Sequence, residues 1–180
     1  DVNLIESMLQ LMGPLVPLYG LLGRTQQRLG AGIPYTVPRN TYRCSDGGWI
    51  AVSSSAESVA QRVLELIGLG GDDRFRGFEA RVAHRELIDE HLGTWIAQRT
   101  RDEVLEEFER VHAAAAPVYD MADIFADPHY RERGAITTVD GVPMPAVVAR
   151  LSATPGRVRW AGRGADADGD DIRAELDDRG

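Results

Sequence analysis

The stretch RNTYRCSDGGWIAVSSS, residues 39–55, decides the fold that the sequence predicts. Two short runs of strand-forming residues, 42–44 and 49–53, lie on either side of Asp46-Gly47. An Asp-Gly pair between two such runs is typical of a tight hairpin turn. The sequence therefore predicts a two-stranded hairpin at this point of the chain.

Three serines, Ser53 to Ser55, follow the second run and open a predicted helix. Ser54 and Glu57 have the spacing of a capping box, in which each side chain satisfies a free backbone N–H at the start of a helix. A serine nucleophile would need a Gly-x-Ser-x-Gly elbow and a base, and neither accompanies these serines. Because a helix N-terminus can bind an anion, contact with a phosphate or carboxylate stays open for Ser54 and Glu57.

Apolar residues at helical spacing predict further helices after this one. A second capping box, Thr100 to Glu103, opens a helix that ends before Pro117. The order of elements is helix, hairpin, three helices, hairpin and extended tail, which is an α/β fold of the α+β kind. The other predicted segments are a buried helix over 4–22 that breaks near its end, a loop over 23–38, a charged loop over 69–83 anchored by Phe75 and Phe78, a helix over 84–98, a short strand at 118–119, a helical turn over 121–125 and a hairpin over 136–151.

Composition limits the classes of function. All 20 basic residues are arginines, so lysine-dependent chemistry is excluded, and they form no cluster typical of nucleic-acid binding. Half of the net charge of −8 falls in residues 163–180, where three arginines face seven acids. This acidic run lacks the spacing of a calcium loop, and the histidines lack metal-ligand spacing, so we expect no metal site.

Membrane insertion and secretion are not expected either. No segment reaches the roughly 18 uninterrupted apolar residues of a membrane span, and the first residues lack the basic region of a signal peptide. The single cysteine, Cys44, fits a reducing compartment and is expected to pack in the hairpin. We expect a cytoplasmic protein.

Several segments in sequence order resemble the class III coenzyme A transferase family, also called the CaiB/BaiF family. Each motif is short, but together they run through nearly the whole chain. The resemblance implies a helix and linker from a large domain over 1–38, a small domain over 39–134, and a return to the large domain with an acidic tail over 135–180. The matching segments are DVNLIESML at 1–9, the hairpin and helix at 38–69, DDRF at 72–75, the two helices at 80–109, APVYDMADIFADPHYRERG at 116–134 and LSATPGRVRWAG at 151–162.

The resemblance implies transfer of coenzyme A between an acyl-CoA and a carboxylic acid. The family's nucleophile is an aspartate upstream of the segment that residues 1–9 match. Its carboxylate attacks the acyl-CoA thioester, and anhydride and aspartyl-CoA intermediates follow. No aspartate here matches that motif, so we expect no catalytic residue in this chain, which alone should be inactive.

The resemblance also implies a partner, which is either a missing N-terminal half or a complementary subunit. Family members form interlocked dimers, so we expect a homodimer or heteromer. The apolar faces of residues 4–22 and 87–96 would then be partly interface, and His91 would be a core or interface histidine.

For the acyl side of the site, we expect Tyr35 and Tyr42 as pocket residues, and Arg39 and Arg43 as candidates to meet an acyl carboxylate. A solvated or paired surface role is the alternative for both arginines. Some family members carry a glycine-rich loop before the hairpin, but GAGIPYTVPRN at 30–40 has no glycine run. The chain also lacks the histidine that the family commonly has near its end.

Two other functions remain open. The related 2-methylacyl-CoA racemases use a glutamate near this helix start to support a catalytic His–Asp pair, and Glu57 falls one residue after that place. Capping explains Glu57 without such a role. A noncatalytic structural subunit is the other alternative, because the nucleophile is not in this chain.

Overall fold

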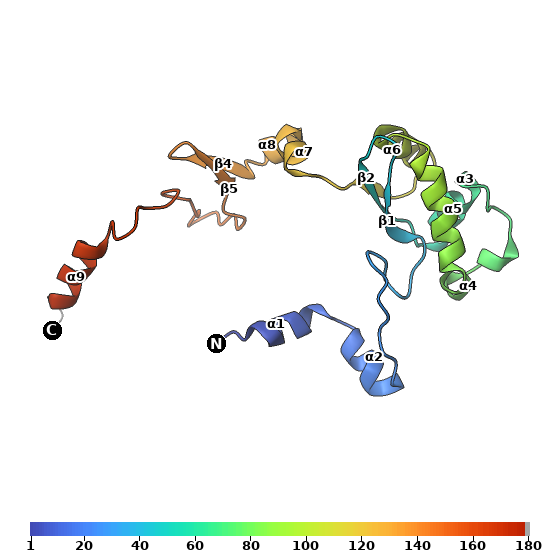
Figure 1. The fold of residues 1–180 in the computed structure, drawn as a ribbon, viewed down its shortest axis with the longest axis horizontal. Helices are drawn as coiled ribbons and strands as arrows, with labels where there is room; N and C mark the ends of the chain where they lie inside the picture. The colour runs from blue at the N-terminus through green and yellow to red at the C-terminus, as the bar shows by residue number, and fades with distance from the viewer. Residues whose placement is uncertain (179–180) are drawn as a thin grey trace. The chain divides into compact units, whose positions relative to one another are not determined.

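The computed structural model describes residues 1–178, and the chain forms two compact units, Asp1–Val118 and Tyr119–Gly180 (Figure 1). Helices and small antiparallel sheets alternate in both, which confirms the predicted α/β class. Unit 1 contains α1 (Leu4–Leu11), α2 (Leu15–Leu22), β1 (Arg39–Arg43), β2 (Trp49–Ser53), α3 (Glu57–Leu66), the 3₁₀ turn η1 (Asp73–Phe75), α4 (Phe78–Ala83), α5 (Arg85–Ala97), α6 (Arg101–Arg110) and β3 (Ala115–Pro117). Unit 2 contains α7 (Met121–Ala126), α8 (Pro128–Glu132), β4 (Ile136–Val139), β5 (Val142–Pro145) and α9 (Gly169–Asp177).

The predicted hairpin is confirmed as β1 and β2, with Tyr42 opposite Ile50 in an antiparallel register. The first strand begins at Arg39, three residues earlier than predicted. At the turn, the carboxylate of Asp46 accepts the backbone N–H of Gly48 at 3.0 Å and that of Arg101 at 2.9 Å. The turn residue therefore also holds the start of α6, which lies 55 positions along the chain.

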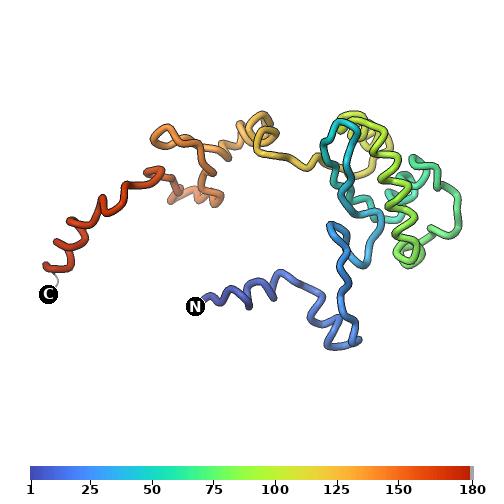
Figure 2. Tube along the Cα trace, viewed as in Figure 1, coloured from blue at the N-terminus to red at the C-terminus, as the bar shows by residue number. Residues whose placement is uncertain are grey.

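The core of unit 1 lies between the hairpin and helices α3, α5 and α6, and Figure 2 shows the backbone trace of this part of the chain. Each helix buries one face, as the apolar spacing predicts. These buried side chains remove apolar surface from water and hold the sheet against the helices. They are Val37, Tyr42, Cys44, Ile50, Val52, Val63, Leu64, Ile67, Phe75, Ile88, Leu92, Ile96, Val104 and Phe108.

The capping box at Thr100 is confirmed, because Glu103 Oε2 accepts the Thr100 N–H at 2.8 Å and Thr100 Oγ1 accepts the Glu103 N–H at 3.4 Å. On the apolar face of α5, Ile88, Leu92 and Ile96 are fully buried in the core of unit 1 itself, whereas Leu87 and Trp95 are only partly buried. His91 is exposed and is therefore not a core histidine, and an interface on residues 87–96 stays a prediction.

Residues 4–22 form two helices with a bend of 77° between them, so the predicted break is present but lies in the middle of the segment and not near its end. Gly13 has φ +54, and Pro14 has no N–H to continue a helix. The prediction of burial is also wrong, since α1 and α2 contain no buried residue. No helix in residues 1–178 is long and apolar enough to cross a membrane, although α1 and α2 pass that test of length and composition as a bent pair.

The third strand lies at Ala115–Pro117, not at 118–119 as predicted, and pairs with β2. Helix α6 ends earlier than the alanine run suggests, because His112 takes a left-handed conformation with φ +51. Arg62 on α3 fixes this end by donating to the carbonyls of Val111 at 2.5 Å and His112 at 2.7 Å. The chain then extends along β2.

The predicted loop over 69–83 contains η1 and α4, so that prediction is wrong in its second half. Phe75 is a buried anchor, as predicted. Phe78 is 47% exposed and therefore a weaker anchor, with its ring beneath the guanidinium of Arg81 at 5.0 Å.

Unit 2 contains the predicted second hairpin, in which Val139 faces Val142 across Asp140-Gly141. Its second strand ends at Pro145, earlier than the predicted 151. The acidic tail forms α9 over Gly169–Asp177. The predicted domain boundaries after residues 38 and 134 stay predictions.

Candidate functional site

The segment that leads into the β1–β2 hairpin is the candidate functional site. Residues 32–38, which we call the strap, lead into β1 and carry two of the predicted acyl-side residues at or beside them. Tyr35 is 57% exposed at the middle of the strap, and Arg39 is exposed where β1 begins. Both side chains are thus available to a ligand or to another polypeptide.

Tyr42 is placed differently, because it is buried in the core with 6% of its surface exposed. Its hydroxyl donates to Asp89 Oδ1 at 2.6 Å, and Asn40 donates to the other carboxylate oxygen at 3.2 Å. Burial raises the pKa of the Tyr42 hydroxyl, and the hydrogen bond and charge of Asp89 raise it further. This geometry argues for a packing role, so Tyr35 and Arg39 remain the acyl-side candidates.

The predicted capping box at Ser54 is wrong. Ser54 is 1% exposed, and its hydroxyl donates to the carbonyl of Ala114 at 2.9 Å, which fastens β2 to the segment before β3. Helix α3 begins at Glu57 after Ala56, with no side-chain cap. Ser54 is therefore a buried structural residue and not an anion contact.

Glu57 binds Arg81 and does not cap the helix. Its Oε2 accepts from Arg81 Nη1 at 2.8 Å, and its Oε1 accepts the Gly77 N–H at 3.3 Å. The hydrogen bond from Arg81 is the main cause that lowers the pKa of Glu57. A carboxylate held in this way is ionised and pairs α3 with the start of α4.

Arg81 is a residue whose role the sequence did not reveal. Its side chain is 1% exposed, although arginine is seldom fully buried. Besides Glu57, it donates to the backbone carbonyls of Val37 at 3.0 Å and Ser55 at 3.2 Å, with a longer contact to that of Phe75 at 3.5 Å. One guanidinium therefore joins the strap, the entry to α3 and η1.

Arg85 was missed in the same way, and it also binds strap carbonyls. No sequence motif marks either residue, because their partners lie up to 52 positions away in the chain. The signal that was available is weak: Arg81 lies between Ala80 and Val82, in a segment whose many charged residues predict a loop.

The lone cysteine does not resemble a nucleophile. Cys44 is buried in the hairpin, as predicted, and burial is the main cause that raises the pKa of its thiol. Among residues 1–178, no group of three or more His, Cys, Asp or Glu side chains is arranged to hold a metal ion.

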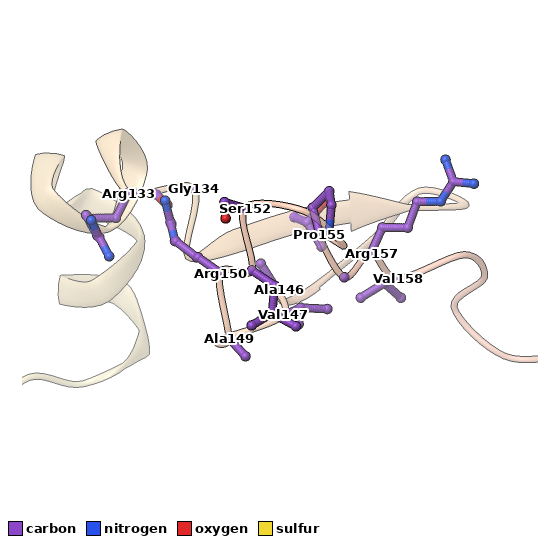
Figure 3. Close-up of a pocket in the computed structure, with 13 residues that line it drawn as sticks. Arg133, Gly134, Ala146, Val147, Ala149, Arg150, Ser152, Pro155, Arg157 and Val158 are labelled. Atoms are coloured by element: carbon purple, nitrogen blue, oxygen red, sulfur yellow. The ribbon is translucent and has the colours of Figure 1, made fainter.

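Unit 2 has an open hollow of about 500 Å³ beside the β4–β5 hairpin (Figure 3). Arg133 and Arg150 lie near one another at one end, and Arg150 donates to the carbonyl of Arg133. Arg157 lines the other end, and its guanidinium points away from the other two in Figure 3. The three charges do not converge, so the hollow has no assembled anion site.

Residues 1–167 match the family described as CoA-transferase family III. A succinyl-CoA–D-citramalate CoA-transferase from Chloroflexus aurantiacus is 31% identical over 170 residues, which cover 90% of this chain and 42% of that relative. The alpha subunit of a succinyl-CoA–L-malate CoA-transferase from the same organism is 30% identical over 166 residues, covering 88% of this chain and 39% of the relative.

The fold is also similar to a solved structure, the crystal structure of a CaiB/BaiF family protein from Brucella suis. The TM-score is 0.76 at 28% sequence identity, and the match covers 94% of this chain and 45% of that one. The chain thus spans about two-fifths of the length of the curated relatives it matches.

Proposed function

The chain belongs to CoA-transferase family III, and we propose that it is the C-terminal part, or a subunit, of an enzyme that moves coenzyme A from an acyl-CoA to a carboxylic acid. The observation that carries this proposal is the match over residues 1–167, which follows the family through both units. The named relatives that support it transfer CoA from succinyl-CoA.

We propose that the nucleophilic aspartate lies in the part of the family fold that precedes residues 1–9. The support is the family resemblance, because no aspartate of this chain stands in a matching motif. Coenzyme A enters as acyl-CoA, whose thioester carbonyl is attacked by that aspartate carboxylate, with the CoA thiolate as the leaving group. The present chain would supply the small domain and the elements that rejoin the large domain.

The strap is the segment of this chain that we propose to lie on the acyl side of the site. Tyr35 presents a half-exposed phenol, and Arg39 presents an exposed guanidinium at the start of β1. An arginine matches a carboxylate in charge and in geometry. Dicarboxylic acyl groups such as succinyl are therefore the substrates we would test first.

The exposed apolar side chains of α1 and α2 support a partner, either the rest of the same chain or a complementary subunit. Leu4, Ile5, Leu11 and Leu21 are each at least 80% exposed, and several exposed large apolar side chains on two short helices are typical of an interaction surface. A homodimer or heteromer in the cytoplasm is the assembly we propose.

The test compares the 180-residue chain with the same chain joined to its upstream family half. Each would be mixed with succinyl-CoA and a carboxylic acid acceptor, and CoA transfer would be followed by liquid chromatography and mass spectrometry. We expect transfer by the complete protein and an aspartyl-CoA adduct on its upstream half. Turnover by the isolated chain would show that the nucleophile has been assigned to the wrong part.

The same experiment separates the alternatives. If the complete protein epimerised a 2-methylacyl-CoA without an acceptor acid, its reaction would be racemisation and not CoA transfer. Assembly with the upstream half but no reaction of either kind would support a noncatalytic subunit.

A further inference from the structure

The strap is held by two arginines from consecutive helices. Arg85, the first residue of α5, uses its Nη2 to donate to the carbonyls of Ile33 at 2.5 Å and Thr36 at 3.3 Å. Arg81 on α4 donates through Nε to the next carbonyl, that of Val37, at 3.0 Å. The strap backbone is therefore fixed by charge-assisted hydrogen bonds although it belongs to no helix or strand.

Pro34 and Tyr35 lie between the two carbonyls that Arg85 binds. A single nitrogen thus closes a short turn, and Pro34 further restricts its backbone. Val37, just beyond the turn, is buried, whereas Tyr35 is 57% exposed. The turn displays the phenol on a backbone that is anchored at both ends.

Helix α5 anchors this arrangement in the core through residues spaced four apart. Arg85 holds the strap, Asp89 binds Tyr42 and Asn40 of β1, and Gly93 lies against the Tyr42 ring, which is 3.5 Å from where a Cβ of residue 93 would stand. Residues four apart lie on one face of a helix. One face of α5 therefore sets the position of the strap relative to the hairpin.

Within residues 1–178, two buried side-chain atoms at the strap, Arg85 Nη1 and Thr36 Oγ1, have no hydrogen-bond partner. An unpaired buried donor opposes stability, so Arg85 stabilises the fold less than its hydrogen bonds suggest. Residues that hold a site in place at the expense of stability are expected where function requires it. This distinguishes Arg85 from Arg62, whose three donor nitrogens all bind carbonyls.

We propose that Arg85 is a positioning residue, which holds the Ile33–Thr36 turn so that Tyr35 contacts the acyl group of the substrate. This inference rests on the proposed CoA transfer. It assigns to Arg85 a role exerted through the strap and not through contact with substrate.

The first test measures the strap directly in the 180-residue chain. Arg85→Met removes the donors and keeps a long side chain, and Arg85→Lys restores charge and some hydrogen bonding. Hydrogen exchange followed by mass spectrometry should show at least tenfold faster exchange of peptides covering 30–38 in the Met variant, with partial rescue in the Lys variant. Exchange in β1 and β2 should stay unchanged, as should exchange of the strap in Arg62→Met, the matched control.

The second test measures kinetics in the complete enzyme. Arg85→Met should raise the KM for the acyl substrate about tenfold, because the released strap would no longer hold Tyr35 against the acyl group, with a smaller effect on kcat. Tyr35→Ala should do the same, and the double variant should be no worse than Tyr35→Ala alone. Arg62→Met should lower thermal stability without this change in KM.

The outcomes separate the two proposals. Unchanged strap exchange in Arg85→Met, or additive effects of Arg85→Met and Tyr35→Ala on KM, would overturn the positioning role. Loss of Tm without a change in KM would also overturn it, because Arg85 would then be purely structural. If Arg85→Met showed faster strap exchange but the unsubstituted complete enzyme transferred no CoA, the proposed function would be overturned, and with it the acyl contact of Tyr35.

Discussion

Removing the Arg81 side chain should destabilise unit 1 more than removing any exposed arginine near it. In Arg81→Ala, the carbonyls of Val37 and Ser55 lose a charge-assisted donor, and a space opens where a fully buried side chain stood. An acceptor left without its partner costs about 1–3 kcal/mol. Two such acceptors give a loss of about 3 kcal/mol in the free energy of unfolding.

Two considerations limit this magnitude. Glu57 is half-exposed, so water can solvate its carboxylate after the change, and we assign no cost to the broken ion pair. Removing the buried guanidinium also removes the cost of its desolvation, which offsets part of the loss in the free energy of unfolding. The cost therefore comes chiefly from the carbonyls and the cavity.

The assay is urea unfolding followed by tryptophan fluorescence. A Trp160→Phe background leaves Trp49 and Trp95, so that the signal reports unit 1 alone. With an m-value of about 1–3 kcal/mol/M, the Arg81→Ala midpoint should fall by about 1–3 M. The matched control is Arg74→Ala, because Arg74 on η1 is mostly exposed and pairs with Asp72.

We expect the control midpoint to stay near that of the parent chain, because exposed ion pairs contribute little. Arg81→Lys should recover only part of the loss, since one ammonium cannot reach carbonyls on the strap, the entry to α3 and η1 together. Equal midpoints for Arg81→Ala and Arg74→Ala would refute the reasoning. Full recovery by lysine would show that charge alone matters.

The remaining predictions concern single contacts in unit 1. The folded-state pKa of Glu57 is lowered, so its contribution to stability is complete above the unfolded pKa near 4.5 and is lost as pH falls through the lower folded value; Glu57→Gln should remove this part of the acid sensitivity in urea midpoints measured from pH 7 to pH 3. Thr36→Val removes an unpaired buried hydroxyl and should leave the Tm unchanged or raise it, and a clear fall would mean that the hydroxyl has a partner. Gly93→Ala places a methyl at ordinary contact distance from Tyr42 and should stabilise α5 by about 0.5–1 kcal/mol, whereas a loss in urea unfolding would show that the ring cannot tolerate it.

Local signals predicted those elements whose stabilising contacts are themselves local. The Asp46-Gly47 turn and the Thr100 capping box are both correct, because their hydrogen bonds join residues two or three positions apart. The apolar spacing of α5 correctly identified its buried face. It could not show that this face packs on the hairpin of the same unit and not on another chain.

The capping box at Ser54 failed because distant groups compete for both of its side chains. Ala114 offers Ser54 a carbonyl from 60 residues away, and Arg81 offers Glu57 a guanidinium from 24 residues away. A buried serine hydroxyl must find a hydrogen-bond partner. A charged guanidinium is a stronger donor to a glutamate carboxylate than a backbone N–H is. Spacing alone cannot reveal either competitor.

The candidate site was predicted in its exposed part and missed in its supporting part. Tyr35 and Arg39 lie at the entrance to the hairpin as exposed side chains, but Tyr42 alternates to the buried face of β1. This alternation follows from strand geometry. It could have been predicted if the strand had been expected to begin at Arg39 and not at Tyr42. The role of Arg85 had no comparable signal in the sequence. Its partners are backbone carbonyls, which every residue has, so no residue type marks them.

The arginines of unit 1 explain how connections without regular structure are held in place. Arg62, Arg81 and Arg85 each donate to backbone carbonyls from segments that are 26 to 52 positions away, at the end of α6, the entry to α3 and the strap. The planar guanidinium carries five donors in a fixed fork and can bind several carbonyls at once, which an ammonium on a flexible stem does less well. In a chain without lysine, these connections are fixed by arginine, and the strap is the connection among them that keeps an exposed aromatic side chain in its middle. The position of Tyr35 therefore depends on a side chain of α5 that need not contact any substrate.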